Sequence, residues 1–136
     1  MSYASPMGES VAKAGDQVVG LDTHVILIPS PGGPVPTPIP HPFTGLIQDN
    51  VSATVFVENM GAAVVGSVAN GAPPHIPMGG PFQTPAANKG TISRGSRTVF
   101  VDGAAVARAG DPAQCCNDPT DQDTGNVIAA SRVFAD

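Results

Sequence analysis

A repeated segment that returns cut in two at the ends of the chain constrains this protein more than any other feature. Residues 98–111 read TVFVDGAAVARAGD, and residues 54–57 (TVFV) with 61–65 (GAAVV) form a partial upstream copy. A third copy is divided: residues 132–136 (RVFAD) match the first half of the unit, and residues 8–16 (GESVAKAGD) match the second half. Such self-similarity has to be found before strands are assigned, because it decides the architecture. Read as a circle, the chain contains three units.

The segments that lead into the repeated strands agree as well. Each has a glycine, then aliphatic or small polar residues, then a serine: Gly45-Leu46-Ile47 with Ser52, Gly90-Thr91-Ile92 with Ser96, and Gly125-Asn126-Val127-Ile128 with Ser131. A repeat interrupted by the termini requires the C-terminal strand to lie beside the N-terminal segment, which closes the ring and leaves no sheet edge free for aggregation. The sequence therefore predicts a pseudo-threefold β structure of three repeats with its termini close together.

Composition favours short strands over helices. The 136 residues include 16 Gly and 15 Pro, a share near that of disordered chains, yet 41% of the residues are hydrophobic and none is Trp. Valine-rich runs between Gly and Pro are typical of short strands joined by turns. We expect an all-β fold and, at this length, a single domain over residues 1–136.

Each unit carries a Val-Phe-Val or Val-Phe-Ala strand, with phenylalanine at positions 56, 100 and 134. Side chains alternate between the two faces of a strand, so each phenylalanine points away from its neighbours. Because large apolar side chains are usually buried, we expect Phe56, Phe100 and Phe134 to lie in a tapering core of Val and Ala, and we assign them no chemistry.

Charge excludes several classes of partner. Six basic and eleven acidic residues give a net charge of −5, and the basic residues form no dense cluster, so nucleic acid binding is not expected. No segment approaches the 18 or more apolar residues of a membrane span, and residues 1–10 (MSYASPMGES) lack the features of a signal peptide. We expect the chain to be made in the cytoplasm.

Two proline-rich segments, residues 28–42 and 72–78, fall outside the repeats. Proline fixes φ and removes a backbone donor, so both segments must run extended. Either could be a flexible linker or a ligand for a proline-binding module. Because a repeat unit lies on each side of the first, we favour a stiff excursion within one domain.

The chain has three histidines, His24, His41 and His75, and we expect all three in loops. Counted from the shared glycine of each unit, His24 lies 16 residues after Gly8, His75 lies 14 after Gly61, and Cys116 lies 13 after Gly103. Three units thus place a metal ligand at a comparable point, and in a threefold object these points converge on one end. An isolated loop histidine is more often solvated, but here every histidine and a cysteine fit one geometric arrangement, a ligand set at one end of a threefold object.

Three imidazole nitrogens and one thiolate form the tetrahedral, closed set that structural zinc prefers. The sequence therefore predicts one structural Zn²⁺ per chain, bound by His24, His41, His75 and Cys116, with Cys115 as the alternative thiolate and iron as the alternative metal. Adjacent cysteines form no disulfide framework. Cys116 is favoured because it precedes the turn-forming run Asn117-Asp118-Pro119.

The run Val106-Ala107-Arg108 within residues 103–111 resembles the proline-alanine-alanine-arginine repeat (PAAR) family, and residues 10–16 share the resemblance. Ala105 stands in place of the name-giving proline, and Val65-Gly66 stands where Ala-Arg is expected in the copy at Gly61. The resemblance covers almost the whole chain. It implies a small conical β protein that caps the trimeric spike of a contractile injection system, such as type VI secretion or a phage-tail-like particle, with zinc held near the apex by three His and one Cys.

The same resemblance implies a structural, non-enzymatic role. The chain would sharpen a trimeric VgrG-like spike protein, one tip per trimer, help to pierce the target membrane, and carry effector or cargo proteins. It would be assembled at the tip of the particle and delivered with it. Relatives often carry an effector extension, for which we expect no room here because the repeats run to Asp136.

Two other functions are kept open. A small hydrolase could use zinc with an open position, or Cys115 or Cys116 with a histidine, although no Gly-x-Ser-x-Gly elbow or His-Glu-x-x-His helix occurs. A proline-rich adaptor could be recruited through residues 31–42.

Overall fold

The computed structural model of the chain describes residues 8–136, and within that range it contains twelve β-strands and no helix. The strands are β1 (Glu9–Ser10), β2 (Gln17–Ile28), β3 (Val35–Asp49), β4 (Phe56–Val57), β5 (Met60–Gly61), β6 (Val68–Gly71), β7 (Lys89–Ile92), β8 (Phe100–Val101), β9 (Ala104–Ala105), β10 (Pro112–Cys115), β11 (Gln122–Ile128) and β12 (Phe134–Ala135). The all-β prediction is confirmed. Over these residues no helix is long and apolar enough to cross a bilayer. The expectation drawn from residues 1–10 falls mostly outside the described part.

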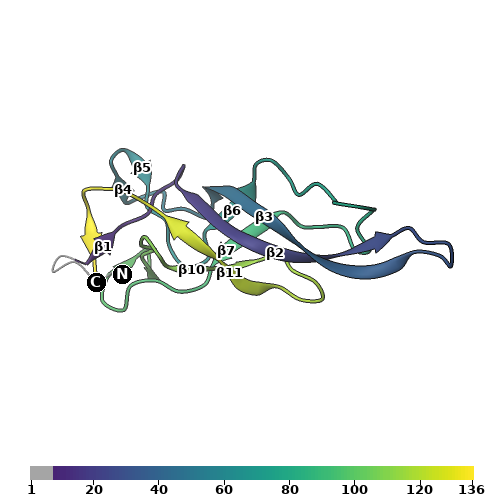
Figure 1. Ribbon diagram of the computed structural model, residues 1–136. Helices are drawn as coiled ribbons and strands as arrows, with labels where there is room; N and C mark the ends of the chain where they lie inside the picture. The colour runs from purple at the N-terminus through teal and green to yellow at the C-terminus, as the bar shows by residue number, and fades with distance from the viewer. Residues whose placement is uncertain (1–7) are drawn as a thin grey trace.

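Six strands close into an antiparallel barrel in the order β10-β11-β2-β3-β6-β7, with β7 paired to β10 (Figure 1). Strands β2 and β3 pair over twelve positions, from Gln17↔Leu46 to Ile28↔Val35, whereas β3 meets β6 only from Gly45 onward. The far half of this hairpin, residues 23–40, therefore extends beyond the barrel. We call it the distal hairpin; it forms the narrow end of the molecule, opposite the chain termini (Figure 1).

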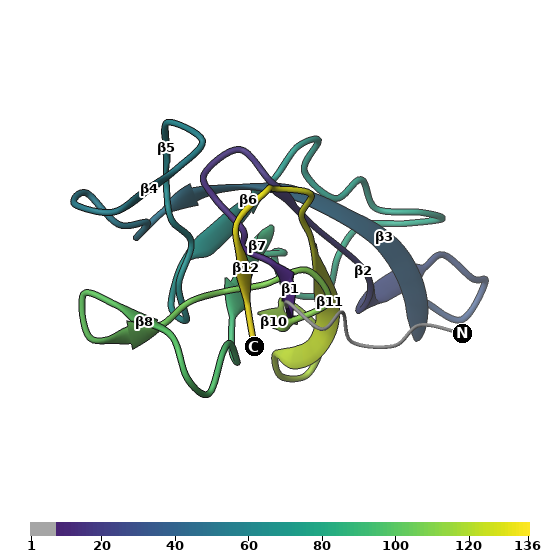
Figure 2. The same cartoon turned by 90° about the vertical axis from the view of Figure 1, so that its left-hand side faces the viewer.

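The divided repeat is rejoined in space at the other end, which we call the wide end (Figure 2). Strand β1 pairs with β12 through Glu9↔Ala135 and Ser10↔Phe134. The two intact copies form equivalent hairpins, β4–β5 and β8–β9. The C-terminal strand thus lies beside the N-terminal segment, as predicted. The barrel itself closes between β7 and β10, so the three two-stranded sheets remain outside it.

Three alanines connect the units around the pseudo-threefold axis. The amide of Ala12 donates to the carbonyl of Ala107, that of Ala107 to Ala63, and that of Ala63 to Ala12, each at 2.9 Å. All three residues are fully buried. A ring of backbone contacts this tight has room for a methyl group and little more, which explains the small residue in the second position of each Val-Ala or Ala-Ala pair.

The lead-in segments are equivalent in the structure as well. The amides of Ile47, Ile92 and Val127 donate to the carbonyls of residues 16, 67 and 111, at 2.8, 3.0 and 2.9 Å. These three side chains belong to the same buried core cluster. The similarity that was read from the sequence therefore reflects a shared core position.

The expectation that the repeated phenylalanines lie in the core is wrong. Phe56 and Phe100 are 60% exposed and Phe134 is 40% exposed, while the residue after each of them is buried: Val57, Val101 and Ala135. Strand alternation does place the phenylalanines and the residues that follow them on opposite faces. The face toward the pseudo-threefold axis, however, carries the smaller side chains, valine and alanine. Three phenyl rings do not fit where the three repeat units meet this closely, so the rings point outward at the wide end.

The first proline-rich segment is confirmed as an extended excursion within the domain, but much of it is strand. Residues from Val35 onward form β3 and pair with β2. His24 and His41 consequently lie in strands β2 and β3, and the expectation that every histidine lies in a loop holds only for His75. The second segment is part of the long connection between β6 and β7, which runs along β2 through Leu27 N to Pro81 O and Gln83 N to Val25 O, both 2.9 Å.

Candidate metal centre

Four segments bring metal-binding side chains to the root of the distal hairpin. Strand β2 supplies Asp22 and His24, which lie two residues apart and so share a face of the strand. Strand β3 supplies His41, which pairs directly with Asp22. His75 comes from the connection after β6, and Cys116 directly follows β10. The side chains of Asp22, His24 and His75 are each at most 2% exposed, so the group is shielded from water.

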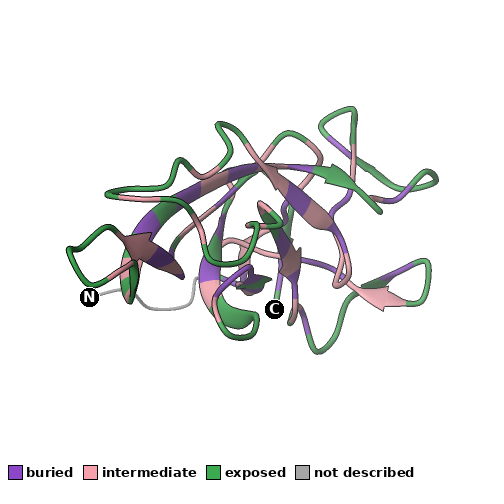
Figure 3. Ribbon diagram, turned by 90° about the vertical axis from the view of Figure 1, so that its right-hand side faces the viewer, coloured by how far each residue is buried: buried purple, intermediate pink, exposed green. Residues whose placement is uncertain are grey.

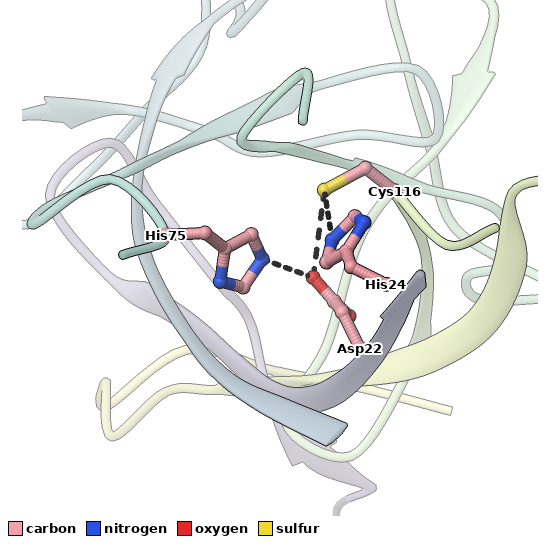
Figure 4. A group of neighbouring side chains, drawn as sticks. All are labelled: Asp22, His24, His75 and Cys116. Atoms are coloured by element: carbon pink, nitrogen blue, oxygen red, sulfur yellow. Dashed lines mark hydrogen bonds and ion pairs between the residues drawn. The ribbon is translucent and has the colours of Figure 1, made fainter. Parts of the chain in front are cut away.

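The donor atoms of Asp22, His24, His75 and Cys116 all lie within 4.8 Å of one another (Figure 4). Cys116 Sγ is 3.6 Å from His24 Nε2 and 3.5 Å from Asp22 Oδ2. Zinc–sulfur and zinc–nitrogen bonds of about 2.3 and 2.0 Å place two tetrahedral ligands about 3.5 Å apart. These atoms are therefore spaced as ligands of one ion are spaced. His75 Nε2 lies 2.8 Å from Asp22 Oδ2, a hydrogen-bond distance.

His41 stands beside this group. Its ring centroid is 5.6 Å from that of His24 and 5.9 Å from that of His75. Nδ1 donates to the carbonyl of Ile39 at 2.8 Å, which leaves the lone pair on Nε2. Nε2 is buried, and no hydrogen-bond partner lies near it among the described residues. A buried nitrogen without a partner is costly, and a bound cation would satisfy it.

Burial decides the charge of the donors. Desolvation, followed by the charge of His75, lowers the pKa of His24, which favours the neutral imidazole that binds a metal. Desolvation is also the main reason that the pKa of the Cys116 thiol is raised. A thiol of this kind is a weak nucleophile, whereas a cation at the site would favour the thiolate. The site thus suits metal binding better than hydrolysis by cysteine.

Cys115, the alternative thiolate, faces away from the group. A Cβ added at Gly125 would lie 2.6 Å from Cys115 Sγ, and one at Gly90 would lie 2.9 Å from it, so this sulfur fills the barrel interior between two glycines. Burial, and next the nearby Asp22, raise the pKa of Cys115 to about 12. Consecutive residues of an extended chain point to opposite sides, and here Cys116 is the one that meets the histidines.

The donor set fits a tetrahedral cation such as zinc. Four buried donors converge, two imidazoles, one thiol and one carboxylate, and the buried imidazole of His41 stands beside them. Such groups are expensive to bury without charge compensation, and imidazole with thiolate is a combination that zinc prefers. His24, His75 and Cys116 belong to the group, and either His41 or Asp22 can complete four ligands.

Asp22 was missed by the sequence analysis. The signal was Asp22-Thr23-His24, an alternation that puts two donors on one face only if the segment is read as a strand. If His24 is assigned to a loop, its spacing of two residues from Asp22 carries no such meaning. The Asp22 side chain is fully buried, and its Oδ1 accepts a hydrogen bond from Thr124 Oγ1 at 3.0 Å.

Comparison with known protein families supports the same reading. A family model described as the PAAR motif matches residues 28–115, which is 88 of the 136 residues. No curated protein matches the chain. The match covers the turn and the β3 side of the distal hairpin, two of the three repeat units, and strands β6, β7 and β10 that lead to Cys116. The chain therefore belongs to the PAAR-motif family, the spike-tip proteins of contractile injection systems.

Proposed function

We propose that this protein caps a trimeric VgrG-like spike through its wide end, points its distal hairpin at the target membrane, and carries effector or cargo proteins. The observation that supports docking most directly is a threefold set of exposed apolar pairs at the wide end. Each unit contributes a valine and the phenylalanine that follows it: Val55 and Phe56, Val99 and Phe100, Val133 and Phe134, all at least 40% exposed.

A threefold partner suits this surface. One trimeric spike offers three equivalent sites, and each could receive one Val-Phe pair of the single tip. Fully burying a phenylalanine contributes roughly 1.5–3 kcal/mol, so three of them supply a substantial part of a docking energy. Exposed aromatic side chains gathered in this way are more typical of an interface than of a free surface.

The metal centre supports the tip from within. We propose that zinc is held by His24, His41, His75 and Cys116, with Asp22 beside it. The ion would supply structural binding energy by linking β2, β3, the connection after β6 and the end of β10. Structural zinc sites of this type contribute about 10–16 kcal/mol of apparent binding energy that is coupled to folding.

The docking proposal is tested by co-purifying the chain with the trimeric spike protein of its own injection system. We expect one chain per trimer. Phe56→Asp, Phe100→Asp and Phe134→Asp together should abolish the complex, and each alone should weaken it at least tenfold. Leu21→Asp is the matched control, because Leu21 is 55% exposed and lies on β2, away from the wide end.

Melting temperature and metal content should stay unchanged in all these variants, since the substituted side chains are exposed. Wild-type affinity in the triple variant would refute docking through the wide end. The role in effector delivery and the assembly of the tip in the particle belong to the same proposal, and they require the complex to form.

A further inference from the structure

The segments that build the narrow end of the molecule carry no charged side chain of their own, although Asp118 of the connection between β10 and β11 lies against them, its Oδ2 accepting from Val25 N at 2.9 Å. Residues 25–48 and 59–88 contain no Asp, Glu, Lys or Arg, although the chain has 17 such residues, 11 acidic and 6 basic. These two segments supply the distal hairpin and the connection after β6 that lies against it. This end of the molecule faces the viewer in Figure 3. Their histidines do not alter this, because His41 is 1% exposed and the side chain of His75 is 2% exposed.

Apolar side chains are exposed at the same end. Val35 at the start of β3 is 49% exposed, and Ile76 and Met78 of the connection are 72% and 43% exposed. Ile76 and Met78 also line a cavity of about 410 Å³ whose other walls include Pro42, Pro73 and Pro74. The surface at this end is thus apolar or uncharged.

The backbone of the distal hairpin also presents few free donors at its edges. On β3, proline occupies every second position: Pro36, Pro38, Pro40 and Pro42. Alternate residues of a strand direct their backbone groups to opposite sides. The carbonyl of Thr44, in phase with these prolines, accepts from Ala72 N and so faces away from β2. The outward positions of β3 between 36 and 42 therefore have no N–H, and the edge cannot recruit another strand.

On β2 the outward amides of residues 23, 25 and 27 are occupied. Thr23 N donates to Asn117 Oδ1 at 2.7 Å and Val25 N to Asp118 Oδ2 at 2.9 Å. Leu27 N donates to Pro81 O at 2.9 Å. The two edges of the distal hairpin thus reach the same result by different means, proline on one side and bonded amides on the other.

These features lower the cost of entering a bilayer. A bilayer core offers no water to replace a lost hydrogen bond, so the lack of charged side chains and of free backbone donors removes part of that cost, while the outward carbonyls of β3 still need water at the interface. We propose that the distal hairpin, with Ile76 and Met78 beside it, partitions into lipid bilayers as an uncharged wedge. This inference rests on the proposed function, in which this end points at the target membrane, and it names lipid as the partner of that surface.

Charge indicates the kind of membrane and the depth of entry. Asp118 lies against residues 23–25 at the near end of the distal hairpin, and Asp121 and Asp123 lie in the connection between β10 and β11 and at the start of β11. They are costly to desolvate, so entry should stop before they reach the interface. With a net charge of −5 the chain is also repelled by anionic surfaces. We therefore expect zwitterionic lipid to be preferred to anionic lipid.

The chain lacks tryptophan, so single tryptophan reporters give a direct test. Val35→Trp and Ile76→Trp mark the distal end. Ile128→Trp is the matched control, because Ile128 is 51% exposed and lies at the end of β11, paired with Gln17 at the barrel. Each variant, loaded with zinc, is mixed with phosphatidylcholine vesicles that contain lipids brominated in the acyl chain.

We expect the emission of both distal reporters to shift to the blue and to be quenched by bromine, while the Ile128→Trp emission stays unchanged. Substituting one third of the lipid by phosphatidylserine should weaken the shift. Flotation of the otherwise unaltered chain with the vesicles should fall at least tenfold in the double variant Val35→Asp, Ile76→Asp, whose melting temperature should match the wild type.

Unchanged emission of both distal reporters would overturn the inference and would leave this surface to a protein partner, such as an effector. Spike co-purification of the Val35→Asp, Ile76→Asp variant separates the two proposals. In that variant, retained spike binding with lost vesicle binding is the expected result. In the unaltered chain, spike binding without vesicle binding contradicts the lipid wedge alone. Vesicle binding without any spike binding contradicts the docking role instead.

Discussion

At the scale of single residues, the two adjacent cysteines show how one step along an extended chain changes the chemistry. Cys116 Sγ lies 3.6 Å from His24 Nε2, whereas Cys115 is buried in the core of the barrel. Both thiols have a raised pKa because they are buried. The two residues are chemically identical, so only the direction in which each side chain points gives them different surroundings.

This difference predicts opposite results for two matched substitutions. Cys115→Ala should keep one zinc per chain and lose about 1 kcal/mol of stability, the cost of a small cavity. Cys116→Ala should lose the ion and lower the melting temperature by on the order of 10 °C, because metal binding is coupled to folding. Metal analysis and thermal denaturation check both. Equal metal loss in the two variants would contradict the assignment.

His41 and Asp22 are the two alternatives for the fourth ligand of the ion. Three neutral imidazoles and a thiolate leave one positive charge on a zinc site, and the buried Asp22 carboxylate would compensate it. We expect His41→Ala to remove a ligand and to alter the absorption bands of the cobalt-substituted protein. Asp22→Asn should keep those bands and lower zinc affinity about 10- to 100-fold, as outer partners do. The reverse pattern of spectra would make Asp22 the ligand.

Asp102 at the wide end predicts a dependence on pH. Hydrogen bonds from Ser52 and Thr54 lower its pKa below the usual 3.8. A group whose pKa is lower in the folded state contributes stability above pH 3.8 and loses it as the pH falls through the folded value. Ser52→Ala should raise the Asp102 pKa toward 3.8, measured by NMR titration of its carboxyl carbon. Ser131→Ala, at the equivalent serine of another unit, should leave it unchanged.

At the scale of elements, the ring of backbone hydrogen bonds among Ala12, Ala63 and Ala107 limits side-chain size. Ala63→Leu should destabilise the protein by about 1–3 kcal/mol or more, because a larger side chain in a packed site forces its neighbours apart. Ala130→Leu, at an exposed position, is the control and should change stability by less than about 0.5 kcal/mol. Chemical denaturation measures both. A neutral Ala63→Leu would show that the ring is not tightly packed.

The repeated strands illustrate what a pattern does and does not predict. Alternation correctly separated Phe100, which is exposed, from Val101, which is buried, but Val99 is 40% exposed as well. It did not decide which face is inside, and the general tendency to bury phenylalanine gave the wrong answer. The space available beside the alanine ring decided which face is buried, and this space is defined only when the three units pack together.

At the scale of the whole molecule, the pairing of β1 with β12 makes the three units equivalent although one is interrupted. The place at which the chain ends interrupt the ring of units should then matter little for folding. A circular permutant that joins Asp136 to Met1 and opens the β4–β5 turn between Glu58 and Asn59 should fold and bind one zinc. Its melting temperature should lie within about 5 °C of the wild type.

A second permutant, opened between Ala62 and Ala63, is the control for this experiment. It cuts the alanine ring and should not fold. Metal content, circular dichroism and melting temperature compare the two chains. If the first permutant also failed to fold, the break between residues 136 and 1 would be part of the fold and not an accident of order.

The sequence by itself determined the number of units, the all-β class, the joined termini and the candidates His24, His75 and Cys116 of the group, because repeats, turn residues and donor types are local properties of the chain. Tertiary structure decided the direction of the phenylalanines, the choice of Cys116 over Cys115 in the group, and the presence of Asp22. Each of these depends on which side of a strand faces the axis or the root of the hairpin. That side is fixed by the packing of segments far apart in sequence, which no local pattern records.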